Sequence, residues 1–233
     1  MPDPSPKQGG DASSRRAGRS QLSRRDAMVL GGIIAGGGLT SAWLQSSAPL
    51  ARDVSMNRAA REALTATSSR SDGNPSGDVR LVAFNDFLCP FCKLTAPELA
   101  NAVRADGNVR VEYVDLALFG PVAEEAASLG LAMALQGKYA QFHHAVMNAR
   151  QGTDRALLRD AVRWIGASWR QAQLDLEANE NEFTVTLKTD ALLAFALGIN
   201  GTPAFLIGGL LAIGRLSEDQ FEDLFEQARK LAS

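Results

Sequence analysis

The two cysteines of the chain lie three positions apart, in the segment Cys89-Pro90-Phe91-Cys92, directly after an apolar run typical of a buried strand. If Val79–Asn85 is that strand and a helix begins at the first cysteine, the two sulfurs share one helical face. That places them within reach of a disulfide with little backbone movement. The spacing therefore predicts a pair that can exist either as a dithiol or as a disulfide.

The proline inside this segment favours a helix start. Pro90 suits the first helical position, because its φ is already helical and its missing N–H would have no intrahelical partner. Cys89 then becomes the N-cap, where free backbone N–H groups and the helix dipole favour an anion. We therefore predict a thiolate of lowered pKa at Cys89, which makes it the attacking sulfur, and a buried resolving thiol at Cys92.

A C-x-x-C pair also occurs as half of a zinc site or as a static structural disulfide. Zinc requires two further ligands, and the two histidines of the chain are the neighbours His143 and His144. Adjacent helical residues point about 100° apart, which is a poor arrangement for chelating one ion. The helix-start context favours redox activity over both alternatives, so we expect no metal ion and no cofactor.

The N-terminal part of the chain has the pattern of an export signal. Residues 1–26 are rich in Pro, Gly, Ser and Arg, which predicts a disordered basic region, and they end with the pair Arg24-Arg25. An apolar run, Ala27–Leu44, follows within a signal or anchor segment that we assign to residues 27–48. Paired arginines before an apolar run indicate the twin-arginine route, although Ala27 and Met28 stand where that signal's pattern has Phe and Leu.

Cleavage of this segment and retention in the membrane both remain open. Ser46-Ser47-Ala48 offers small residues for cleavage, but Pro49 follows them. The apolar run is about 27 Å long as a helix, close to the thickness of a bilayer. With the arginines held inside, the remaining chain faces outward in either case. We therefore expect it in the periplasm or on the outer face of the cytoplasmic membrane, where thiols are readily oxidised.

The remaining sequence predicts a linker and one folded domain. We assign residues 49–76 to the linker, with a short helix through Met56–Leu64, and residues 77–233 to the domain. A hydrophobic content of 45% is enough for one substantial core. Residues 62–233 hold fifteen basic and twenty-two acidic side chains, so the folded part is mildly acidic. This charge argues against nucleic acid as a partner.

The domain reads as an α/β arrangement with a block of helices in the middle. The helix from Cys89 towards Ala105 contains Pro97, and Asn108–Asp115 alternates as a second strand. Residues 203–213 then read as two strands joined by a glycine turn, and Glu218–Leu231 reads as an amphipathic helix. Between the second strand and this hairpin, helical spacing of apolar residues appears in Glu124–Leu135, Tyr139–Asn148, Arg155–Ile165, Trp169–Glu177 and Phe183–Leu197.

Two motifs carry a family resemblance over roughly Gly77 to the C-terminus. One is Phe84-x-Asp86-Phe87-x-Cys89-Pro90-Phe91-Cys92-Lys93, and the other is Gly201-Thr202-Pro203-Ala204-Phe205. Together they resemble the DsbA family of thioredoxin-fold oxidoreductases, especially its periplasmic or membrane-tethered branch. The resemblance implies a thioredoxin-like α/β fold with a helical insertion, at about residues 120–200, between the second strand and the strand after the cis-proline.

The resemblance also implies roles for individual residues. Pro203 becomes the cis-proline beside the cysteines, and Thr202 offers its backbone to a substrate peptide. The alternative for Pro203 is the plain start of a strand. Phe91 stands where the best-known members have a histidine that stabilises the thiolate. Ala83 stands where many thioredoxin-fold proteins carry a buried acid that helps proton transfer.

Asp86, three residues before the first cysteine, either replaces that acid or caps the helix. Phe87 and Leu88, with Phe91, form either an apolar collar for unfolded clients or part of the core. His143 follows Phe142 as in the family, and we expect a packed, hydrogen-bonded helix residue rather than a catalyst. The remaining candidates, Trp164 and Trp169, are expected in the core.

These features predict an exported thiol-disulfide oxidoreductase that acts on reduced or unfolded exported proteins. The reaction we favour is disulfide formation, with a DsbB-like membrane oxidant or an equivalent restoring the enzyme. The same atoms run backwards in a reductase or isomerase, and that alternative stays open. A periplasmic chaperone or metal-site assembly module without turnover is the alternative from another class.

Overall fold

The structure is a computed structural model that describes residues 49–150 and 152–232. The expectations for residues 1–26 and 27–48, including the twin-arginine pair and the signal or anchor segment, therefore lie outside the described residues. Within the described ranges, no helix combines the length and the apolar character needed to cross a membrane.

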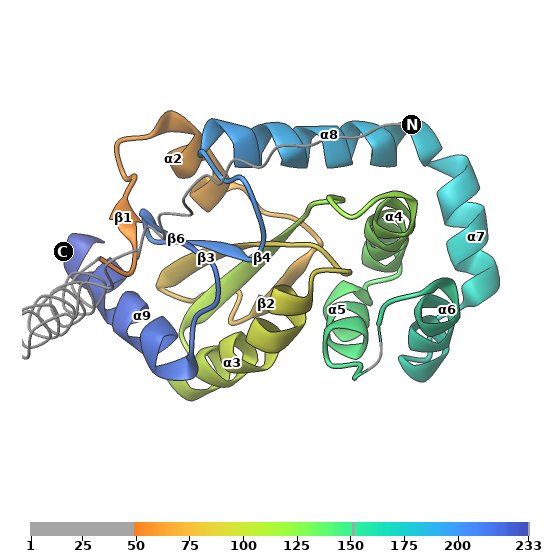
Figure 1. The fold of residues 1–233 in the computed structure, drawn as a ribbon, viewed down its shortest axis with the longest axis horizontal. Coiled ribbons are helices and arrows are strands. Elements are labelled where there is room, and N and C mark those ends of the chain that lie inside the picture. The colour runs from red at the N-terminus through yellow and green to blue at the C-terminus, as the bar shows by residue number, and fades with distance from the viewer. Residues whose placement is uncertain (1–48, 151, 233) are drawn as a thin grey trace, which may run out of the picture. The chain divides into compact units, whose positions relative to one another are not determined.

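A six-stranded mixed sheet forms the centre of the fold (Figure 1). Its two longest strands are β3 (Val79–Asn85) and β4 (Val109–Asp115), which run parallel with Asn85 paired to Asp115. On the other side of β3 lie β5 (Ala204–Ile207) and β6 (Leu210–Ile213), both antiparallel to their neighbours. Because β3 and β4 are parallel and in register, their carboxyl ends bring two polar residues side by side.

Helices cover both faces of this sheet. On one face, α3 (Pro90–Asp106) and α9 (Glu218–Ala232) pack against the side chains of Leu81 and Ala83. The opposite face of β3, formed by Val82 and Phe84, packs with α2 (Arg58–Thr65) and the end of α8 (Glu180–Ala196). The alternating direction of side chains along β3 thus explains why this strand reads as continuously apolar.

The helical block lies between β4 and β5, as the sequence predicts. It consists of α4 (Pro121–Leu135), α5 (Tyr139–Met147), α6 (Arg155–Trp164), α7 (Trp169–Ala178) and α8. Trp169 is partly buried against the core, but Trp164 is 64% exposed, so the prediction of a core position for it is wrong. Trp164 is the last residue of α6, and only the preceding turns of that helix bury apolar side chains.

The segment expected as a linker is part of the folded unit. Residues 49–76 supply β1 (Arg52–Asp53) and β2 (Ser71–Gly73), which form the two edges of the sheet, as well as α2. The compact unit accordingly begins at Leu50 rather than at Gly77. Strands of two or three residues are too short to leave an alternating pattern, which is why this contribution is not visible in the sequence.

Candidate active site

The turn between β3 and α3 is fixed by one buried carboxylate. Asp86 accepts hydrogen bonds from the backbone N–H groups of Leu88 at 2.7 Å, Leu118 at 2.6 Å and Phe119 at 3.3 Å. Burial raises the pKa of Asp86, and these hydrogen bonds act in the opposite direction. The N-cap of α3 is Cys89, so a capping role for Asp86 is wrong. Its role in proton transfer stays a prediction, while its contacts tie two loops together beside the cysteines.

Cys89 occupies the N-cap of α3 with Pro90 directly after it, as predicted. Its sulfur accepts a hydrogen bond from the N–H of Cys92 at 3.4 Å, and neither cysteine forms a disulfide in this structure. The pKa of Cys89 is lowered to about 6, chiefly by its hydrogen bond with Cys92 and further by Thr202 and backbone N–H groups, against the effect of burial. The pKa of Cys92 is raised by the same hydrogen bond and by burial. The two thiols therefore differ in pKa, and the negative charge of the reduced pair resides on the sulfur of Cys89.

The loop before β5 faces this sulfur. The Thr202–Pro203 peptide bond is cis, and the Cys89 sulfur lies 3.3 Å from the carbonyl oxygen of Thr202, to which it donates a hydrogen bond when it is protonated. Residues more than a hundred positions apart thus meet at the active site. Binding of a substrate peptide by Thr202 and Pro203 stays a prediction, since the structure places them beside the reactive sulfur without a ligand that tests the role.

The aromatic residues around the cysteines divide into core and surface. Phe87 is buried and contacts Phe142 edge to face, with ring centroids 5.5 Å apart, so it belongs to the core. Phe91 is 58% exposed, and Leu88 lies between these extremes. The loop held by Asp86 adds Leu118 and Phe119, each more than half exposed. The apolar surface at the site therefore includes two residues that the sequence did not single out.

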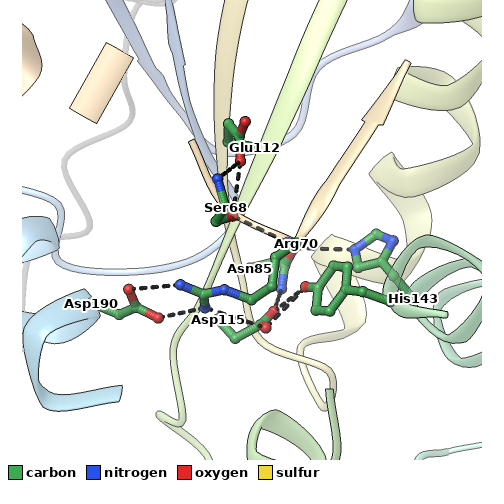
Figure 2. A network of polar contacts seen from close by, with 8 residues as sticks. Ser68, Arg70, Asn85, Glu112, Asp115, His143 and Asp190 are labelled. Atoms are coloured by element: carbon green, nitrogen blue, oxygen red, sulfur yellow. Dashed lines mark hydrogen bonds and ion pairs between the residues drawn. The ribbon is translucent and has the colours of Figure 1, made fainter. Parts of the chain in front are cut away.

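A buried polar network includes Asn85, Asp115 and His143 (Figure 2), and two of these residues, Asn85 and His143, line a small cavity together with Cys92. Asp115 accepts hydrogen bonds from Asn85 at 2.7 Å and from Tyr139 at 2.7 Å, and Asn85 Oδ1 lies 3.1 Å from Nε2 of His143. Burial raises the pKa of Asp115 to about 6, although the nearby charge of Arg70 lowers it. Burial lowers the pKa of His143 to about 3, so this side chain is neutral. His143 is packed and hydrogen-bonded, as the sequence predicts.

The network continues to a buried ion pair between segments far apart in the chain. Arg70 contacts Asp190 through two hydrogen bonds, of 2.6 and 3.1 Å, and lies 3.7 Å from Asp115. Burial opposes the charge of Arg70, but the hydrogen bonds to Asp190 and the nearby carboxylates raise its pKa. Among the described residues, no group of three His, Cys, Asp or Glu side chains is arranged to hold a metal ion.

Sequence reasoning did not single out most of this network. Asn85 and Asp115 had a usable signal, because each ends a predicted strand and parallel neighbours place their ends together. No such signal marked Arg70 or Asp190. Arg70 lies in the segment expected to be a linker, and Asp190 lies on a helix with several other charged residues.

The model of the DSBA-like thioredoxin domain matches residues 80–226 of the chain, which is more than half of it. The chain belongs to this family. A thioredoxin-like oxidoreductase from Silicibacter pomeroyi is 35% identical, with a TM-score of 0.68, and the match covers 73% of this chain and 98% of that one. The thiol-disulfide exchange protein alpha-DsbA2 from Wolbachia pipientis is 25% identical, with a TM-score of 0.66, over 76% of this chain and 93% of that one. The Cys89–Cys92 pair is thus the C-x-x-C pair of a DsbA-like thiol-disulfide oxidoreductase.

A third solved structure supports only the fold, and the two curated relatives match this chain over a small part of their own length. A periplasmic thioredoxin-like protein from Salmonella enterica serovar Typhimurium shares the fold at 24% identity, with a TM-score of 0.64, over 76% of this chain and 98% of that one. The Na(+)/H(+) antiporter NhaA 1 of Mycolicibacterium gilvum is 28% identical over 142 residues, which are 59% of this chain and 23% of that protein. The antiporter of Mycolicibacterium vanbaalenii is 30% identical over 56% of this chain and 22% of that protein. The chain therefore spans less than a quarter of the length of these curated relatives.

Proposed function

We propose that this oxidoreductase forms disulfides in reduced proteins outside the cytoplasm. The observation that carries the proposal is the stabilised thiolate of Cys89, whose pKa is lowered to about 6. Stabilising this thiolate stabilises the reduced form of the pair, so the disulfide form is a better oxidant. A pair tuned in this way passes its disulfide to a client more readily than it reduces one.

The reaction follows from the unequal thiols. A client thiolate attacks Cys89 of the oxidised pair, the Cys89–Cys92 bond breaks, and Cys92 leaves as a thiolate that takes up a proton. A second client thiolate then attacks the client sulfur of the mixed disulfide, and Cys89 leaves as its stabilised thiolate. The client gains a disulfide, and the enzyme is left with two electrons that a membrane oxidant must remove.

Three features support unfolded exported proteins as clients. Phe91, Leu118 and Phe119 offer exposed apolar side chains at the site, which suits chains that have not yet buried their own. The cis-proline loop holds backbone groups next to Cys89, where an extended peptide can pair with them. Arg24-Arg25 followed by an apolar run supports export, by the twin-arginine route, to the periplasm or the outer face of the membrane.

Oxidative refolding of a reduced, unfolded disulfide protein tests the direction of electron flow. We expect the oxidised full chain to form client disulfides, and both Cys89→Ser and Cys92→Ser, which cannot hold the Cys89–Cys92 disulfide, to be inactive. Mixed with a client that already carries disulfides, reduced Cys92→Ser should accumulate a mixed disulfide, because the Cys89 thiolate attacks the client disulfide and no second thiol resolves the product. Catalysed reduction of insulin without oxidative refolding would contradict the proposal and assign a reductase or isomerase. Suppressed aggregation that survives loss of both cysteines, with no exchange, would instead favour a chaperone or metal-site assembly module.

A further inference from the structure

The loop between β4 and α4 exposes two neighbouring apolar side chains. Leu118 is 53% exposed and Phe119 is 54% exposed. Contact of large apolar side chains with water is unfavourable, and each would lose part of it if the loop folded back onto the protein. A short loop that keeps both side chains in solvent therefore depends on contacts that fix its backbone.

The two ends of this loop are fixed by the elements around it. The backbone N–H of Leu116 donates to the carbonyl oxygen of Asn85 at 2.7 Å, and the Leu116 side chain is buried. At the other end, Gly120 adopts a φ of 83° at the N-cap of α4, directly before Pro121. The orientation of the residues between these ends depends on their own backbone contacts.

The carboxylate of Asp86 makes these contacts. Its Oδ2 accepts hydrogen bonds from the backbone N–H groups of Leu118 at 2.6 Å and Phe119 at 3.3 Å. Its Oδ1 accepts a hydrogen bond from the N–H of Leu88 at 2.7 Å, and Asp86 is 0% exposed. One buried carboxylate thus connects the two exposed residues with the residue directly before Cys89.

An uncharged side chain of the same shape cannot hold both segments. The amide of an asparagine has one oxygen, and it places N–H donors where the second carboxylate oxygen accepts. Whichever way this amide turned, either Leu88 or the pair Leu118 and Phe119 would face a donor. An N–H left without a partner inside the protein is costly, which favours movement of the loop towards water. The link between the loop and the turn therefore requires the carboxylate.

We propose that Asp86 is a positioning residue for client recognition. Its carboxylate holds Leu118 and Phe119 at a fixed place relative to Cys89, so apolar segments of an unfolded client bind there while the client thiol reaches the sulfur. Asp86 acts through the loop, and the benefit depends on the apolar character of the client. This role rests on the proposed action on unfolded proteins and is independent of the direction of electron flow.

Two model clients of equal length separate recognition from thiol chemistry. Both are unstructured peptides with two thiols, and one carries several phenylalanines and leucines where the other carries serines. In the oxidised full chain, a peptide thiolate attacks Cys89 and the Cys89–Cys92 bond breaks. The second peptide thiolate then attacks the peptide sulfur of the mixed disulfide, which leaves an oxidised peptide and a reduced enzyme. Free enzyme thiols counted over time give a rate constant for each peptide.

The ratio of the two rate constants reports recognition. For the wild type, we expect the apolar peptide to react about tenfold faster, as when a client partly buries a large apolar side chain. Asp86→Asn and Phe119→Ala should each lower this ratio by about fourfold, whereas Phe119→Ala added to Asp86→Asn should lower it further by less than about 1.5-fold. Phe195→Ala removes a side chain that is 81% exposed on α8 and is the control, which should keep the wild-type ratio.

A second variant removes the same contact from the side of the donor. Leu118→Pro lacks the N–H that the Asp86 carboxylate binds, and Leu118→Ala is its control for the lost side chain. We expect Leu118→Pro to lower the ratio by about threefold more than Leu118→Ala, because only the proline variant also releases the loop that holds Phe119. This comparison decides the proposal if Asp86→Asn does not fold, as judged by chemical denaturation.

The outcomes that contradict the proposal are distinct. A wild-type ratio in folded Asp86→Asn overturns it, as do equal ratios for Leu118→Pro and Leu118→Ala. Slowing of both peptides by the same factor in Asp86→Asn would assign the carboxylate to chemistry at the cysteines instead. Equal rates of both peptides with the wild type overturn this inference alone, whereas no reaction with either peptide overturns the thiol-disulfide function as well.

Discussion

At the scale of single residues, the chemistry depends on the difference between two thiols of the same helix turn. The free N–H groups at the N-terminus of α3 stabilise the thiolate of Cys89, and the backbone N–H of Cys92, one turn further into the helix, donates a hydrogen bond to its sulfur. Phe91, between them, is exposed and contributes no hydrogen bond from its side chain. The thiolate is thus stabilised by the neighbouring thiol of Cys92, by Thr202 and by backbone N–H groups, without help from the side chain of Phe91.

The stability of the reduced protein should depend on pH through Cys89. Folding lowers its pKa from the ordinary value of 9.0 to about 6, so the stabilisation is fully present above pH 9 and is lost as pH falls through 6. Relative to Cys89→Ser, the free energy of unfolding should rise between these limits by at most about 4 kcal/mol, because solvent screening reduces the contribution of the full shift. Urea titrations of both reduced proteins across that range check this. If the difference in unfolding free energy between the two proteins did not change with pH, the pKa of Cys89 would be the same in the folded and unfolded states.

Replacing Phe91 by histidine should strengthen the oxidant. A protonated imidazole beside Cys89 lowers the pKa of that thiol by about one unit or more. The reduction potential should then rise by about 30 mV for each tenfold shift of the equilibrium from the disulfide towards the dithiol form of the pair. Phe91→Leu, which introduces no charge, is the control. Thiolate absorbance and glutathione equilibration measure both effects, and equal values for the two variants would contradict this account of Phe91.

At the scale of elements, the sheet and helices that carry the site follow from patterns in the sequence. The strands β3 and β4 and the helices α3 to α9 match expected segments closely, because each is long enough to show its period or, in β3, a continuous apolar run. The edges β1 and β2 were hidden within an expected linker, since pairing with β6 and β4 defines them and no local period does. At this scale, the sequence does not reveal which short segments pair with strands that are distant along the chain.

Close packing of α4 is the element-scale feature most open to test. A Cβ added at Gly130 would lie 3.3 Å from Tyr139 and 3.5 Å from both Asp115 and Phe87. We expect Gly130→Val to lower the free energy of unfolding by about 1–3 kcal/mol, the usual cost of overpacking. Gly152→Val is the matched control, because nothing lies within 4 Å of a Cβ there. Equal denaturation midpoints for the two variants would show that α4 is not packed as described.

At the scale of the whole domain, one buried ion pair joins the segment before β2 to the helical block. Arg70 precedes β2 and reaches Asp190 on α8 as well as Asp115 on β4. The sequence identified the cysteines, Thr202 and Pro203, whose motifs are local. It could not identify Arg70 or Asp190, because a buried charge is recognisable only once its distant partner is known.

Breaking this ion pair should destabilise the domain strongly. Arg70→Met leaves the charges of Asp190 and Asp115 buried without their partner, at a cost of about 3–5 kcal/mol. The double variant Arg70→Met/Asp190→Leu should recover a large part of this loss, because it replaces charge by apolar contact. Chemical denaturation of the single and double variants measures the coupling. Additive losses would show that the two residues do not interact.

The reduction potential of the Cys89–Cys92 pair tests the central claim most directly. It is obtained by equilibrating the full chain with mixtures of reduced and oxidised glutathione and counting the free thiols. Because the Cys89 thiolate is stabilised, we predict a potential more positive than about −180 mV, the value typical of protein disulfide isomerase. A potential near about −270 mV, as in thioredoxin, would contradict the assignment of this protein as an oxidant.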